Sequence, residues 1–363
     1  MVGYNILEGI SPLVRNLFLF QFRNKEDEQV ENLRQKREQA EHYIIGPYGV
    51  LSENSKGRRQ PEEEDEVRTC FQRDVDRITH SKSFRRLKHK TQVFLSPEGD
   101  HYRTRLTHTL EVARLARTVA RALQLNEDLA EAIALGHDIG HTPFGHAGER
   151  ALNEIYPEGF KHYQQSLRVV DILERKGRGL NLCEETRIGI LNHTYGGPED
   201  SREATVVRLS DRIAYVNHDL DDALRAGILS EKDIPPRIRE VCGDRNSRRI
   251  NAIITDLINN STDGEIQMSP EMQDVFDEFH NFMFSDVYTN PLAKGEEDKV
   301  KGILECIYEH YVCAPEEMPE ECRMVAETEG VERAACDYVA GMTDSYALER
   351  FSEFFIPSAW TVK

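Results

Sequence analysis

The residues from Leu135 to Glu149 constrain this chain most, because they place histidines and carboxylates among glycines and a proline. The ionisable residues of the run are His137, Asp138, His141, His146 and Glu149. Such groups are costly to bury beside an apolar helix pattern unless each has a partner. The run therefore predicts a polar centre inside the protein, and we interpret it as the heart of a metal-dependent hydrolase.

Three helices are predicted around this run. Apolar spacing predicts a helix over 106–123, and extending its apolar face backward reaches His108. Asn126 is a suitable N-cap for a second helix, whose apolar face ends at His137. A third helix is expected over 203–226, and its polar side carries Asp211, Tyr215, Asp219 and Asp222. No useful strand pattern stands out, so we predict an all-α fold with a helical C-terminal region.

The chemistry of the His137-Asp138 pair suits a divalent cation. Imidazole nitrogen together with carboxylate oxygen is a donor set for Mn, Fe, Co, Zn or Mg. The dipeptide alone is weak evidence, but His108 and Asp211 are candidates to complete a ligand set. Taken alone, His108 is more often a core histidine, and Asp211 with Asp219 and Asp222 is more often a solvated helix face. Their combination favours a metal centre.

The residues His146 and Glu149 are three apart in a predicted helix and share one face. A carboxylate beside an imidazole fixes its tautomer and raises its pKa, which suits a general acid. The alternative is an ordinary pair on the helix surface.

Basic residues cluster over 84–92 and again at Arg103 and Arg105, against the acidic character of the whole chain. Arginine and lysine at such density fit a polyphosphate ligand. A positively charged helix face is the alternative explanation for each of them. A formal net charge of -18 opposes non-specific binding to nucleic-acid backbones.

The cysteine pattern and the absence of a long apolar run indicate the cellular compartment of the protein. Seven scattered cysteines without a CxxC pair argue against a disulfide framework and against a cysteine zinc site. No stretch of 18 or more apolar residues is present. We expect a cytoplasmic protein that does not interact with membranes.

We predict three parts along the chain. Residues 1–60 form a peripheral N-terminal segment, with a charged helical pattern over 26–41. Residues 61–230 form the catalytic core, whose first helix is expected near Val67, after a proline and a run of acids. Residues 231–363 form a helical C-terminal region that completes the site and makes oligomer contacts.

The chain resembles the HD-domain phosphohydrolases and, within them, the deoxyguanosine triphosphate triphosphohydrolases. The pattern of His108, His137-Asp138 and Asp211 carries the first resemblance. The second rests on motifs within 71–74, 80–94, 102–112, 137–149, 211–219 and 337–344. It covers roughly 67–350 and implies an all-α HD-domain helical core that hydrolyses deoxynucleoside triphosphates to deoxynucleoside and triphosphate.

The resemblance also implies roles for individual residues. The implied metal ligands are His108, His137, Asp138 and Asp211. The implied catalytic residues are His146, Glu149 and His162. The implied substrate contacts are Gln92, Arg105, Arg212, Tyr215 and Asp219, the last two on the sugar and Arg212 near the phosphates. The resemblance also implies a homo-oligomer, and it leaves open the base preference, the native metal and activation by a second nucleotide.

Two departures from the family pattern are visible. Arg212 stands where relatives often have lysine, which keeps the charge and changes the phosphate geometry. Tyr163-Gln164 follows His162 in place of the expected Asn-Glu. One rival function is another HD phosphohydrolase, acting on nucleoside monophosphates, cyclic nucleotides or alarmones. The other is a nucleotide sensor or single-stranded nucleic-acid binder without catalysis.

Overall fold

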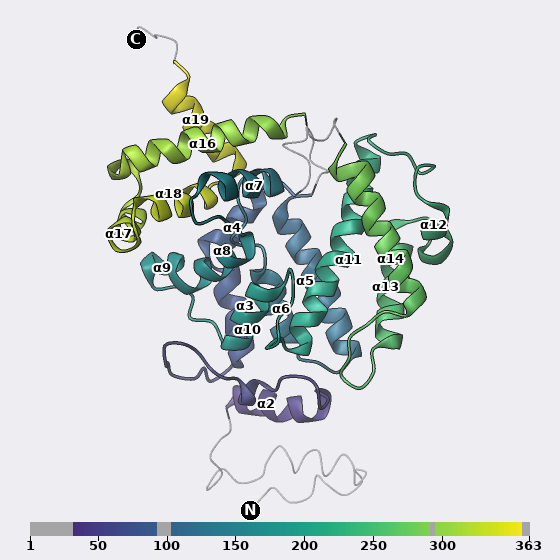
Figure 1. Ribbon diagram of the computed structural model, residues 1–363. Helices are drawn as coiled ribbons and strands as arrows, with labels where there is room; N and C mark the ends of the chain where they lie inside the picture. The colour runs from purple at the N-terminus through teal and green to yellow at the C-terminus, as the bar shows by residue number, and fades with distance from the viewer. Residues whose placement is uncertain (1–31, 93–102, 291–294, 358–363) are drawn as a thin grey trace, which may run out of the picture.

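The computed structural model describes residues 32–92, 103–290 and 295–357, and every long element in them is a helix (Figure 1). The only β pairing among these residues consists of isolated bridges, such as that between Arg58 and Cys183. The predicted all-α fold is confirmed. None of the described helices combines the length and the apolar character that crossing a membrane requires.

The α-helices described up to residue 225 are α2 (Leu33–Ile44), α3 (Cys70–Thr79), α4 (Lys82–Arg86), α5 (Arg105–Ala122), α6 (Glu127–Gly136), α7 (Gly145–Ile155), α8 (His162–Arg168), α9 (Glu174–Gly177), α10 (Glu184–Asn192) and α11 (Arg202–Arg225). The later helices are α12 (Pro236–Cys242), α13 (Asn246–Asn260), α14 (Pro270–Met283), α16 (Glu297–Cys313), α17 (Glu320–Glu329), α18 (Val331–Ala340) and α19 (Asp344–Phe355).

The helices that surround the site start at polar caps. The Thr104 side chain caps α5 in a capping box with Thr107, and the Asn126 side chain caps α6 as predicted. The Ser201 side chain accepts a hydrogen bond from a backbone amide at the start of α11. The helix expected near Val67 instead begins at Cys70, because Thr69 supplies the capping side chain and 61–68 stays irregular. Of the helical pattern over 26–41, only the part from Leu33 is described as helix, in α2; 1–31 lie outside the described residues.

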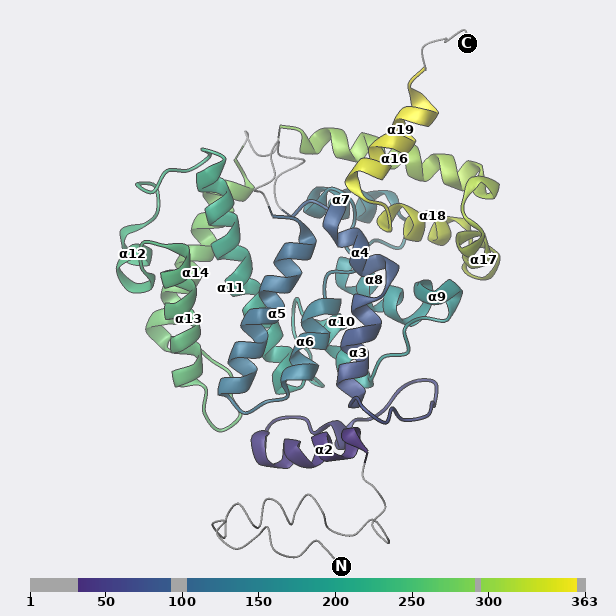
Figure 2. The same cartoon turned by 180° about the vertical axis from the view of Figure 1, so that it is seen from behind.

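A first apolar core lies between α3, α5, α6, α10 and α11 and extends to α13 and α14. The fully buried residues Ile78, Val112, Ile133, Ile190 and Val216 belong to it. Figures 1 and 2 show α5, α6 and α11 side by side at the centre of the molecule. The predicted metal ligands lie in α5, in α11 and directly after α6, so the core fixes their relative positions.

A second apolar core joins α7 to α16, α18 and α19. It includes Leu152 from α7, Leu304 and Tyr311 from α16, and Val339 from α18. Thus α12 to α14 pack with the first core, whereas α16 to α19 pack with α7. This arrangement divides the helices differently from the expected boundary at residue 230, and the three-part division stays a prediction.

Buried polar residues join the two cores next to the segment 139–144, which links His137-Asp138 to α7. Lys90 is buried and donates through Nζ to the carbonyl oxygens of His141 and Ala340, the latter over 2.8 Å. The Asp344 carboxylate accepts from the backbone amides of Thr91 and Phe144 over 2.9 and 2.8 Å. The chain near 340–344 therefore positions the residues that follow His137-Asp138.

Candidate metal centre

The four predicted metal ligands meet where α5, α6 and α11 pack together. His108 lies one turn into α5, His137 and Asp138 follow directly after α6, and Asp211 lies in the middle of α11. Nε2 of His108 is 3.0 Å from Oδ1 of Asp211. Nε2 of His137 is 3.6 Å from Oδ2 of Asp138 and 3.7 Å from Oδ1 of Asp211.

These residues fit a divalent cation. Nδ1 of His137 lies 2.6 Å from the carbonyl oxygen of Ala134, so this nitrogen carries the proton and Nε2 presents a lone pair. That Nε2 is buried and has no hydrogen-bond partner among the described residues. A bare imidazole nitrogen that faces two carboxylates is a donor set for a transition metal or zinc.

The electrostatics of the centre keep both carboxylates ionised. Burial alone raises the pKa of Asp138, but Arg105 and the surrounding histidines outweigh it and hold that pKa well below its usual range. Burial also opposes ionisation of Asp211, and the hydrogen bond from His108 lowers its pKa in spite of it. Asp138 is buried and Asp211 is 23% exposed, and two ionised carboxylates that both face Nε2 of His137 favour a bound cation.

Arg105 links the centre to the predicted phosphate contacts. Its Nη1 lies 2.6 Å from Oδ2 of Asp138, and both residues are buried. Its Nε and Nη2 have no hydrogen-bond partner among the described residues, which leaves donors for an anionic ligand. Gln92 is also buried, its Oε1 has no partner within the described chain, and its backbone approaches Gly145.

The predicted catalytic pair is part of a larger cluster of histidines. Both oxygens of Glu149 are 3.0 Å from Nδ1 of His162, whereas Nδ1 of His146 is 3.6 Å from Glu149. The His146 side chain is 48% exposed, while that of His162 is 11% exposed. Glu149 therefore orients His162 more closely than it orients its predicted partner.

The pKa of Glu149 lies below its usual range. Burial alone would raise that pKa, but hydrogen bonds from His146 and His162 lower it by more than burial raises it. Glu149 is therefore an ionised carboxylate beside both histidines.

The turn between His137 and α8 is held by a close backbone approach. Oγ of Ser166 donates to the carbonyl oxygen of His137 over 2.7 Å and accepts from the amide of Gly140 over 3.0 Å. A Cβ atom placed on Gly140 would lie 2.1 Å from the amide nitrogen of Ser166. Glycine is therefore required at position 140 to keep His137 and Asp138 in their positions relative to His162.

The polar side of α11 is buried at the residues predicted to contact sugar. Asp219 is fully buried and Asp222 is 3% exposed, so the solvated-face alternative is wrong for these two residues. Oη of Tyr288 donates to Oδ2 of Asp219 over 2.5 Å, and the ring of Tyr288 stacks on Tyr215 with centroids 5.2 Å apart. Burial raises the pKa of Asp219 to about 7.

Arg212 is the predicted site residue that the structure does not bring to this centre. Its side chain is 43% exposed, and Nη2 lies 3.9 Å from Oδ1 of Asp277. Its guanidinium lies 5.5 Å from the ring of Phe276, a contact with α14. It neighbours Asp211 in sequence, but successive residues of a helix point about 100° apart.

Comparison with known proteins agrees with this geometry. A family model for the HD domain matches residues 105–216, and one for a phosphohydrolase-associated domain matches residues 266–353. A deoxyguanosinetriphosphate triphosphohydrolase-like protein from Caldanaerobacter subterraneus subsp. tengcongensis is 51% identical over 329 residues, covering 90% of this chain and 97% of that protein. The chain belongs to the deoxyguanosinetriphosphate triphosphohydrolase-like family.

Other relatives of this triphosphohydrolase-like chain carry the same name. One from Clostridium perfringens is 48% identical and one from Desulfatibacillum aliphaticivorans is 47% identical, each over 90% of this chain and 98% or more of its own length. A solved structure of a hypothetical protein from Aquifex aeolicus covers 78% of this chain and 71% of its own, at 19% identity. Its TM-score of 0.43 is too low to establish a shared fold.

The two family models match different polar residues of the triphosphohydrolase-like chain. The HD match includes all four predicted ligands, whereas Tyr288 and Asp344 lie in the phosphohydrolase-associated match. Sequence reasoning missed Tyr288, and also the buried His193, whose Nε2 is 3.1 Å from Nε2 of His162. Neither has a motif around it, so no local signal pointed to them.

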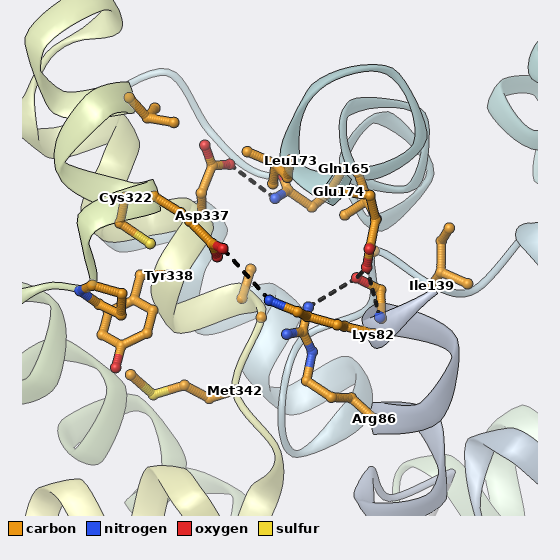
Figure 3. Close-up of a pocket in the computed structure, with 18 of the residues that line it drawn as sticks. Lys82, Arg86, Ile139, Gln165, Leu173, Glu174, Cys322, Asp337, Tyr338 and Met342 are labelled. Atoms are coloured by element: carbon orange, nitrogen blue, oxygen red, sulfur yellow. Dashed lines mark hydrogen bonds and ion pairs between the residues drawn. The ribbon is translucent and has the colours of Figure 1, made fainter. Parts of the chain in front are cut away.

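One cavity of the triphosphohydrolase-like chain lies next to Ile139 and Gly140, the residues that follow His137-Asp138. It has a volume of about 480 Å³ and is bordered by Ile139 and Gly140 of the turn, by α4 and by α18. Figure 3 shows Lys82 and Arg86 from α4 opposite Asp337 from α18 and beside Glu174. None of the predicted ligands lines it.

Proposed function

We propose that this chain hydrolyses deoxynucleoside triphosphates to the deoxynucleoside and inorganic triphosphate. The observation that carries the proposal is the arrangement of Arg105, which pairs with Asp138 and keeps Nε and Nη2 without partners among the described residues. A buried guanidinium with unused donors beside a candidate metal centre suits the phosphates of a nucleotide. The family names and the HD domain support the same reaction class.

Each group of proposed site residues would have its own role in the reaction. A divalent ion held by His108, His137, Asp138 and Asp211 would supply charge neutralisation and acidify a water. Arg105 would hold the phosphates in place, and Gln92 would contact the substrate beside it. Tyr215 and Asp219 would bind the 3′-hydroxyl and exclude a 2′-hydroxyl.

We assign the proton donor to His146, which is half-exposed and 3.6 Å from Glu149. Its imidazole could protonate the departing 5′-oxygen of the sugar while Glu149 stabilises the charged ring. His162 is held by Glu149 and faces His193, so its second nitrogen is turned toward protein. Arg212 contacts α14 here and has no assigned part in the reaction.

Product analysis tests the proposal. Purified protein would be incubated with each of the four deoxynucleoside triphosphates, singly and mixed, with Mg or Mn. We expect deoxynucleoside and triphosphate in equal amounts, and faster turnover in mixtures if a second nucleotide activates. Release of phosphate or pyrophosphate would assign the chain to another HD phosphohydrolase class, and binding without turnover would favour a sensor.

A control variant makes the test specific to the centre. Asp211→Asn removes one candidate ligand charge and keeps the shape of the side chain, so we expect turnover to disappear. Asp277→Asn changes an exposed carboxylate on α14 and should leave turnover near normal. Equal activity of both variants would contradict the metal assignment.

A further inference from the structure

The cavity of about 480 Å³ beside Gly140, drawn in Figure 3, is not used by the proposed function. We call it the Gly140 cavity. Its lining comes from α4, α8, α9, α17 and α18 and from the chain around residue 342. Much of that lining is apolar and includes Ile139, Val169, Leu173, Val325, Ala334 and Met342. A pocket of this volume, largely apolar with a few polar groups, suits a small organic molecule.

Arg86 is a charged residue of this lining that lacks a partner of opposite charge. Its Nη2 donates to Oγ of Ser83 over 2.8 Å. Its Nε is buried and has no hydrogen-bond partner among the described residues. Within the described part of the chain, the Arg86 guanidinium forms no ion pair with a carboxylate, and its one hydrogen bond is the contact with Ser83.

Glu174 does not supply the missing partner, because Ser83 uses its carboxylate. Oε1 of Glu174 accepts from the backbone amide and from the hydroxyl of Ser83, each over 2.7 Å. Burial lowers the pKa of Arg86 in spite of the nearby charge of Glu174, but a guanidinium stays protonated in proteins. A cation in partly apolar surroundings without a counter-ion is costly. The cavity therefore favours an anionic occupant.

The other charged residues of the lining limit how much negative charge the occupant can carry. Asp337 is already held by arginines that lie outside the cavity. Nζ of Lys82 is 3.5 Å from Oε1 of Glu321, and both Arg175 and Lys176 are exposed. The lining as a whole has one more cation than carboxylate. A triphosphate would bring several negative charges close to three carboxylates, whereas a single carboxylate matches the excess charge.

We propose that the Gly140 cavity binds a small organic molecule with one carboxylate and an apolar body. The carboxylate would bind the guanidinium of Arg86, whose planar donors match its geometry. The apolar body would lie against the aliphatic side chains of the lining. Ile139 and Gly140 follow His137-Asp138 directly, so the occupant would act on the candidate metal centre as an effector. The inference goes beyond the proposed function and does not rest on it.

Calorimetric titration of the purified full chain tests the need for a negative charge. The probe is the naphthoate anion, and its matched neutral molecule is the corresponding naphthamide. We expect one naphthoate per chain and about 10–100-fold weaker binding of the amide, because the amide cannot pair with a guanidinium. Equal affinity for the two molecules would overturn the inference.

Variants of two neighbouring arginines separate a specific contact from general attraction. Arg86→Gln should weaken naphthoate binding by about 10–100-fold and leave naphthamide binding unchanged. Arg85→Gln is the matched control, because Arg85 is exposed, donates to the carbonyl oxygen of His80 over 3.0 Å and does not line the cavity. It should keep the wild-type affinity. An equal loss in both variants would contradict binding at Arg86.

Alkylation of cysteines in the wild-type protein locates the probe without any variant. Cys322 lines the cavity, whereas Cys313 is exposed and does not. With naphthoate at about ten times its Kd, labelling of Cys322 by iodoacetamide should fall about tenfold, and labelling of Cys313 should not change. Peptide mass spectrometry measures both rates. Unchanged labelling of Cys322 would overturn the inference, and equal protection by inorganic triphosphate would contradict the single-charge requirement.

Discussion

Tyr288 donates a hydrogen bond to Asp219 over 2.5 Å and thereby places the π-helical segment Phe284–Tyr288 against the polar side of α11. The two residues are 69 positions apart in the chain. Stacking of Tyr288 on Tyr215 brings a second residue predicted to contact sugar into the same cluster. The phosphohydrolase-associated part of the chain therefore covers the residues that we expect to recognise the deoxyribose.

Replacing Tyr288 by phenylalanine tests how much this contact stabilises the fold. The change leaves the buried oxygens of Asp219 without the hydroxyl donor, which costs roughly 1–3 kcal/mol of unfolding free energy. Urea denaturation at about pH 8 measures the difference. Tyr195→Phe, at a side chain that is 77% exposed, is the control and should not change stability. Equal stability of the two variants would mean that Tyr288 contributes nothing through its hydroxyl.

The raised pKa of Asp219 predicts a pH dependence of stability. Burial raises that pKa from 3.8 to about 7, so the folded protein keeps a proton that the unfolded chain has lost. Because the folded state binds more protons between these values, stability falls as pH rises through that window, by at most about 4 kcal/mol.

The variant Asp219→Asn isolates this effect because an amide cannot titrate. We expect the Tm of the variant relative to wild type to increase from about pH 4.5 to about pH 8. Differential scanning fluorimetry at several pH values measures it, and the comparison cancels groups that titrate in both proteins. A constant difference in Tm would show that Asp219 is already ionised at low pH.

Gly140 provides a test of the turn that carries His137 and Asp138. In Gly140→Ala the new Cβ would lie 2.1 Å from the backbone nitrogen of Ser166, so one of the two segments has to move. We expect a loss of stability of roughly 1–3 kcal/mol and weaker metal binding. Gly302→Ala is the control, because its Cβ meets nothing within 4 Å in α16, and we expect up to about 1 kcal/mol of stabilisation.

Glu149 offers a test of the proton donor. Glu149→Gln keeps the size of the side chain and removes the charge that stabilises a protonated His146. We expect kcat to fall by about 10²–10⁴-fold with little change in KM, measured by release of deoxynucleoside. Metal content should stay at the wild-type value, since Glu149 is not among the proposed ligands. Near-normal turnover would exclude the role of Glu149 in proton transfer.

The fold was largely accessible from sequence because the signals that define helices are local. The observed α5, Arg105–Ala122, and α11, Arg202–Arg225, differ from the predicted helices by one residue at each end. Caps at Thr104 and Ser201 explain this agreement, since each side chain satisfies a backbone amide three residues further along. The start of α3 was missed because Thr69 caps it, which the acidic run before it did not indicate.

The candidate site was accessible only in part, because its contacts join distant segments. His137-Asp138 and His108 stand out through their position on apolar helix faces. His193 and Tyr288 carry no such pattern, and only tertiary packing places them beside His162 and Asp219. Asp219 contacts Tyr288 and Asp222 contacts Arg103, and a helix-face argument on α11 alone includes neither partner.

The ammonium group of Lys90 has a consequence for how the chain can be divided. It is buried, and one of its two acceptors is the carbonyl oxygen of Ala340, while Asp344 holds the amides of Thr91 and Phe144. All residues proposed to act on substrate or metal come earlier than residue 220. A fragment that ended there would contain the whole chemical apparatus yet expose Lys90 and release two backbone amides beside it. Such a fragment would contain the proposed ligands and substrate-binding residues but would lack the C-terminal contacts that hold them in position.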